Sequence, residues 1–84
     1  MIFLLEYDRQ AGQLVNLARF PDALRPEAES SRLSLELRNF AASVSHEIVL
    51  LEAAAESNLR RTHRRYFEGL EALTRAAAPA SSEV

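Results

Sequence analysis

The chain has 84 residues, of which 48% are hydrophobic and 26% are charged, and its formal net charge is -2 at pH 7. This length allows one domain, the charge argues against a general polyanion binder, and the absence of cysteine excludes disulfides and thiolate metal sites. A domain this small buries only about 60% of the surface of its unfolded chain, so oligomerisation is a common source of added stability.

The N-terminal residues 1–5 are apolar, but Glu6 and Asp8 interrupt the run and no basic residue precedes it. We therefore do not expect a signal peptide, and no stretch reaches the ~18 apolar residues of a membrane span. All ten basic residues are arginine, which together with abundant alanine is common in GC-rich bacterial genomes. These features predict a small bacterial protein in the cytoplasm, without membrane contact.

Two apolar runs at the N-terminus predict a β-hairpin. Residues 2–7 form the first strand, residues 8–12 form a loop in which Gly12 can adopt a positive φ, and residues 13–20 form the second strand. Neither face of the second strand is uniformly polar, so the pattern does not indicate which face points to the core.

An amphipathic helix is predicted next, and Pro26 suits its first turn. Its apolar stripe recurs at i, i+4, i+7, i+8 and i+11 and comprises Leu33, Leu37, Phe40, Ala41 and Val44. This spacing predicts about five turns with one apolar side that covers the sheet. Leu35 points away from the stripe, toward solvent or a partner.

Residues 46–52 place four large aliphatic side chains between charged ends, a run typical of a strand covered on both faces. A rival interpretation continues the helix through this segment, because no glycine or proline occurs between Glu27 and Glu68 and aliphatic residues recur at helical spacing. We favour the strand, because one helix over residues 26–76 would far exceed the usual ~11–12 residues.

A second helix follows, for which Ser57 is the expected N-cap and Pro79 the end. Its apolar side comprises Leu59, His63, Tyr66, Phe67, Leu70 and Leu73. The predicted fold is α+β with element order ββαβα. It has a three-stranded, antiparallel or mixed sheet of order 2-1-3, with two helices on one face. The domain spans residues 1–78, and residues 79–84 form a disordered tail.

The first and third strands are apolar on both faces, so two helices on one face would leave the other uncovered. A contiguous exposed apolar face typically marks an interface, and a twofold homodimer is its simplest closure. We therefore expect a non-catalytic binding or assembly module that forms homo-oligomers through a sheet face or strand edge. The alternative is a monomer covered by its own termini. The candidate interface residues are Ile2, Leu4, Ile48 and Leu50.

Four arginines lie within six residues of the second helix: Arg60, Arg61, Arg64 and Arg65. Guanidinium groups bind phosphates bidentately, so the alternative function is a nucleic-acid-binding accessory protein. The competing interpretation is a solvated face on which Glu56 and Glu68 pair with Arg60 and Arg64 at i, i+4 spacing. The acidic half of a neighbouring subunit could also pair with these arginines.

Patterns typical of enzymes are missing from the sequence. It has no cysteine nucleophile, no G-x-S-x-G motif and no glycine-rich phosphate loop. His63 is expected to pack and His46 to lie on the surface, and neither has metal-ligand spacing. Glu6, Asp8 and Glu52 could gather at strand ends, although such carboxylates are usually solvated. We therefore expect no catalytic activity, no metal and no cofactor.

Overall fold

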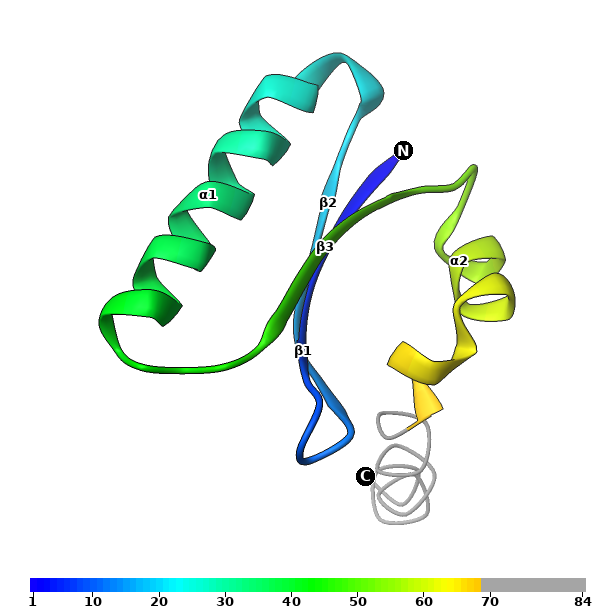
Figure 1. Cartoon of the computed structure of the whole chain (residues 1–84). Coiled ribbons are helices and arrows are strands. Elements are labelled where there is room, and N and C mark those ends of the chain that lie inside the picture. Colours follow the sequence, from blue (N-terminus) through cyan, green and yellow to red (C-terminus); the bar gives the residue numbers. More distant parts are fainter. Residues whose placement is uncertain (69–84) are drawn as a thin grey trace, which may run out of the picture.

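The computed structural model describes residues 1–68 and has the predicted α+β fold (Figure 1). Strands β1 (Ile2–Asp8), β2 (Gln13–Phe20) and β3 (Glu47–Glu52) form an open antiparallel sheet of order β2-β1-β3. The 3-10 helix η1 (Asp22–Leu24) leads into α1 (Arg25–Ala41), while α2 (Glu56–Thr62) and η2 (Arg64–Tyr66) follow β3. The predicted order of elements and strands is confirmed. The predicted tail, residues 79–84, lies outside the described residues.

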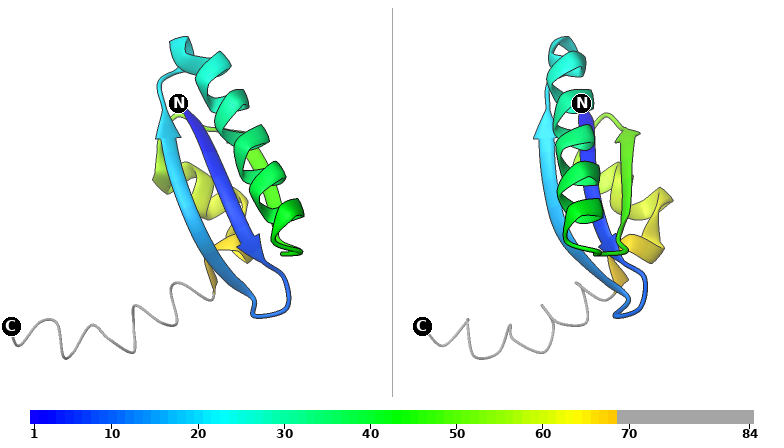
Figure 2. Two further views of the ribbon diagram at one scale, coloured as in Figure 1. Left: turned by 90° about the vertical axis from the view of Figure 1, so that its left-hand side faces the viewer. Right: turned by 60° about the vertical axis from the view of Figure 1, so that its left-hand side comes forward.

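The central strand β1 is buried on both faces, because every residue from Ile2 to Tyr7 is buried. Its side chains alternate, so Phe3 and Leu5 point to one face while Leu4 and Glu6 point to the other. The two helices lie on opposite sides of the sheet (Figures 1 and 2). This differs from the predicted placement of both helices on one face, and the reason is that each face of β1 needs its own cover.

The main hydrophobic core lies between the sheet and the α2 side. Phe3, Leu5 and Tyr7 pack against Leu59, Tyr66 and Phe67 in this core. The rings of Tyr7 and Tyr66 meet edge to face, with centroids 5.2 Å apart and planes at 86°. None of the helices within residues 1–68 is long and apolar enough to cross a membrane.

The second helix is shorter than predicted. Its N-cap is Ala55 rather than Ser57, and no side chain caps it. It ends at Thr62, because the backbone of His63 leaves the helical region with φ -124° and ψ 55° before η2 begins. Residues 70 and 73 of the predicted apolar side lie outside the described part of the chain.

A bulge in β2 explains why neither of its faces looked polar. Glu6 pairs with Asn16 and Tyr7 pairs with Leu14, so Val15 is an extra residue. Leu14 and Leu17, three positions apart, can therefore both pack against the α2-side core. The preceding loop closes as predicted, with Gly12 at φ +67°.

The end of α1 separates it from β3 and excludes the rival continuous helix. The N–H of Ser43 donates to the carbonyl of Phe40 at 3.2 Å, and the N–H of Val44 donates to that of Asn39 at 2.8 Å. This is the Schellman pattern of hydrogen bonds. Ser43 has φ 57°, in the left-handed region where glycine is favoured.

Candidate functional site

Helix α1 turns its small and polar side toward the sheet and its apolar side outward. Ala28 and Asn39 are buried, whereas Leu33 is 56% exposed, Leu37 is 60% exposed and Phe40 is 84% exposed. The prediction that this stripe covers the sheet is wrong. We call the four side chains that face outward along α1 and just beyond its end the outward stripe: Leu33, Leu37, Phe40 and Val44.

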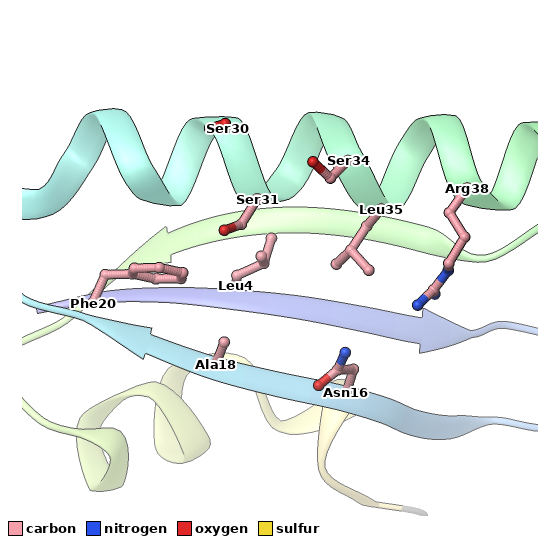
Figure 3. Close-up of a pocket in the computed structure, with 9 residues that line it drawn as sticks. All are labelled: Leu4, Asn16, Ala18, Phe20, Ser30, Ser31, Ser34, Leu35 and Arg38. Atoms are coloured by element: carbon pink, nitrogen blue, oxygen red, sulfur yellow. The ribbon is translucent and has the colours of Figure 1, made fainter.

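Leu35 also differs from its predicted orientation, in the opposite sense to the outward stripe. Leu35 was expected to point toward solvent or a partner, but it is only partly exposed and lines a groove between α1 and the sheet. Figure 3 shows it directed toward the strands, on the same side of α1 as Ser31 and Arg38. The helix is therefore rotated by about half a turn from the orientation that its apolar spacing favours.

The buried carboxylate of Glu6 explains this rotation. Glu6 is 2% exposed, and its oxygens accept hydrogen bonds from Arg38 Nη2 at 2.9 and 3.0 Å and from Asn39 Nδ2 at 3.0 Å. A buried charge without partners costs several kcal/mol, so α1 must present Arg38 and Asn39 to the sheet. At 100° per residue these two positions lie on the side opposite the outward stripe.

His46 completes the polar cluster from the loop before β3. Its Nδ1 lies 2.7 Å from Glu6 Oε2, and its Nε2 lies 3.7 Å from Asp8 Oδ2. With a side chain only 20% exposed, His46 is more enclosed than the surface position expected for it. The third carboxylate considered from the sequence, Glu52, lies at the opposite end of the sheet and pairs with Arg25.

The environment keeps Glu6 ionised at neutral pH. Burial raises the pKa of Glu6, but hydrogen bonds from His46, Asn39 and Arg38 together outweigh burial and hold its pKa below the ordinary value of 4.5. Within residues 1–68, no group of three or more histidine and acidic side chains could hold a metal ion. Because both oxygens of Glu6 are occupied by protein donors, the cluster is suited to orienting α1.

A groove with a volume of about 430 Å³ separates α1 from the β1–β2 half of the sheet (Figure 3). Leu4, Ala18, Phe20 and Leu35 supply its apolar lining, and Asn16, Ser30, Ser31, Ser34 and Arg38 supply its polar lining. Short serine side chains do not fill the space between helix and sheet. The α1 side thus combines the buried Ile2 and Leu4 with polar contacts and an unfilled groove, in contrast to the aromatic core on the α2 side.

The predicted arginine cluster does not form one helical face, because the chain turns at His63. Arg60 pairs with Glu56, with Nη2 2.9 Å from Oε2, and lies over the ring of Phe67. Of the two i, i+4 pairs expected, Glu56 with Arg60 is present, whereas Arg64 and Glu68, both within residues 1–68, form no ion pair with each other. Arg65 binds Glu47, with Nη2 3.0 Å from Oε2.

Only half of the arginine cluster is therefore available to an anion. Arg61 and Arg64 are exposed and make no ion pair with another of residues 1–68. Glu56 and Glu47 offset much of the field that Arg60 and Arg65 would supply.

The four predicted interface residues fall into two groups. Ile2 and Leu4 are 0% and 3% exposed beneath α1, which contradicts their assignment to a free apolar face. Ile48 and Leu50 are partly buried in β3, where they pair with Glu6 and Leu4 of β1.

Ile48 connects the edge strand β3 to the outward stripe. A surface hollow of about 280 Å³ is lined by Ile48, Phe40 and Val44, together with polar residues that include His46 and Asn39. The candidate site is therefore the outward stripe of α1 and the adjoining part of β3. Periodicity identified the stripe, but its outward direction depends on Glu6, which is 32 residues away from Arg38 in the chain.

No protein family, no curated protein and no solved structure matches this chain.

Proposed function

We propose that this chain is a non-catalytic binding and assembly module that associates with itself through the outward stripe of α1. The observation that supports this is the exposure of Leu33, Leu37 and Phe40 in one row, at 56%, 60% and 84%. Folded domains seldom leave a contiguous apolar patch in water unless it serves an interaction. Full burial of each such side chain is worth about 1.5–3 kcal/mol, which offsets part of the entropic cost of association.

This proposal keeps the homo-oligomer expected from the sequence but moves its contact surface. Helix α1 replaces Ile2 and Leu4, while Ile48 at the edge of β3 remains part of the surface. Our proposed location is the cytoplasm, where disulfides do not persist and a cysteine-free chain loses nothing.

Self-association is tested by light scattering and sedimentation over roughly micromolar to millimolar concentration. The apparent mass of the unmodified chain should rise with concentration, whereas the variant Leu37→Ser/Phe40→Ser should remain a single chain with unchanged helix and strand content. Val15→Ser is the matched control, because Val15 is also exposed, at 53%, but lies on β2. A chain that stays monomeric over the whole range would refute the proposal.

The alternative function, nucleic-acid binding, receives support only from Arg61 and Arg64. Two phosphate contacts would give a shallow salt dependence, with a slope of about -1.8 in log K against log salt on duplex DNA. We therefore expect no binding at physiological salt. Tight binding there that Arg61→Gln/Arg64→Gln abolishes, and that Arg60→Gln/Arg65→Gln retains, would favour this alternative over self-association.

A further inference from the structure

We infer that two copies of the chain pair α1 against α1 in an antiparallel orientation. The twofold axis lies between the two helices, at the height midway between residues 38 and 39. This inference rests on the proposed function and adds that the stripe of one copy contacts the stripe of the other, and in which direction. The outward stripe has gaps of four, three and four residues, so its spacing reads the same from either end. A twofold contact requires such self-complementarity, because the same patch serves both copies.

The antiparallel register places residues whose numbers add to 77 at the same height along the paired helices, and each flank of the stripe faces the same flank of the second copy. Leu37 then faces Phe40 of the second copy, and both residues lie on α1. Leu33 lies at the height where α1 of the second copy has ended, beside the segment after Ser43 that carries Val44. Antiparallel helices also set the positive end of one helix dipole beside the negative end of the other, whereas parallel helices would align like ends.

The flanks of the stripe allow the two helices to approach closely. Ser34 and Ala41 lie beside the stripe on one side, are exposed, and carry small side chains. On the other side, Glu36 forms an ion pair with Arg32 of its own helix, with Oε1 3.8 Å from Nε. In this register the flank that carries Glu36 faces Ser43 of the second copy, so no two like charges meet.

The size of the contact indicates a weak dimer. One aromatic side chain buries about 150–250 Å², and the four stripe residues of two copies would cover on the order of 800 Å² in total. Stable specific interfaces bury about 1,200–2,000 Å². A contact below this range is typical of weak or transient association, which suits a reversible assembly module.

Because the chain has no cysteine, single cysteines can report the orientation directly. In the antiparallel register, Ser34 of one copy and Ala41 of the other lie on facing flanks, about 3 Å apart along the axis. Two copies of Ser34 are about 14 Å apart along the axis, at 1.5 Å per residue, too far for a disulfide. A mixture of full-length Ser34→Cys and Ala41→Cys chains of different mass should therefore give mainly mixed disulfide dimers on oxidation.

Leu33→Cys is the control for the opposite orientation. Two copies of Leu33 are about 16 Å apart along the axis in the antiparallel register but adjacent in a parallel one. Efficient cross-linking of Leu33→Cys with none in the mixture would overturn the antiparallel orientation while leaving self-association intact. Association without any of these cross-links would show that α1 does not contact α1, and a monomeric unmodified chain would refute the proposed function itself.

Discussion

The guanidinium of Arg38 holds the carboxylate of Glu6 with Nη2 2.9 Å from Oε1 and 3.0 Å from Oε2. The Glu6 side chain is 2% exposed, whereas the Arg38 side chain is 57% exposed. The two partners are therefore unequal: without Arg38 a buried charge loses a donor, whereas without Glu6 the cation remains in water.

This inequality predicts different costs for the two substitutions. Arg38→Met should lower the free energy of unfolding by about 2–3 kcal/mol, since His46 and Asn39 still serve the buried carboxylate. Glu6→Gln should cost only about 1–2 kcal/mol, because its amide keeps some of the hydrogen bonds. Urea unfolding at neutral pH measures both values, and a larger loss for Glu6→Gln would contradict this ranking.

Acid should destabilise the fold through three carboxylates. The pKa of Glu6 is held below 4.5 by the hydrogen bonds that outweigh its burial. The hydrogen bond from Tyr66 and the charge of Arg65 lower the pKa of Glu47. For Glu56, burial raises the pKa, but the hydrogen bonds and charges of Arg60 and Arg19 outweigh burial, so its pKa is lowered overall.

A folded-state pKa below the unfolded value gives stability that is present above the unfolded pKa and lost as pH falls through the folded one. The free energy of unfolding should therefore decrease below about pH 4.5, measured by urea titration between neutral pH and pH 3. Glu6→Gln should show a shallower decrease. An unchanged slope in that variant would mean that Glu6 does not contribute.

The backbone conformation of Ser43 predicts that a glycine at this position would stabilise the fold. Ser43 adopts φ 57° at the end of α1, a conformation that costs a residue with a Cβ atom roughly 1–2 kcal/mol. Ser43→Gly removes this cost but gains freedom in the unfolded chain, so a net gain of about 0.5–1 kcal/mol is expected in thermal or urea unfolding. Ser45→Gly is the control and should give no gain, because among non-glycine residues 1–68 only Ser43 has a positive φ.

The hydroxyl of Tyr66 ties η2 to the sheet. It donates to Glu47 Oε2 at 2.7 Å and accepts from Arg65 Nη2 at 2.8 Å. Tyr66→Phe keeps the ring packing against Tyr7 and should cost about 1–2 kcal/mol, toward the lower end for a hydrogen bond to a charged group because Glu47 is partly exposed. Calorimetric unfolding measures the loss. A neutral result would show that solvent replaces the hydroxyl without penalty.

The strands were predictable because their apolar runs are short and bounded by charged or turn residues, and β3 adds two β-branched residues. The placement of β1 at the centre also followed, because the first helix returns the chain so that β3 runs parallel to β2 and β1 fits between them, antiparallel to both. The direction of α1 was not predictable from spacing, which shows that Leu33, Leu37 and Phe40 share a side but not what that side contacts. One buried acid on a distant strand reverses the outcome, and nothing in the periodicity of α1 reports it.

Two local features were hidden for a similar reason. The end of α1 is made by Ser43 in a conformation normally marked by glycine, and the extra residue in β2 shifts the alternation at Val15. Both break the usual link between residue type and backbone conformation. The polar cluster left one signal in the sequence, a glutamate within the apolar run of β1, although such strand-end carboxylates are usually solvated.

Because the two helices cover opposite faces of one strand, each can detach from the sheet without the other. The aromatic face joins β1 to α2 and η2 through close packing, whereas the serine-lined face joins it to α1 through the Glu6 cluster and across an unfilled groove. Sub-global opening should follow this division: amide protons of α1 should exchange with deuterated solvent before those of β1. A second copy bound to α1 would then protect the less stable half of the molecule and leave exchange from the other half unchanged.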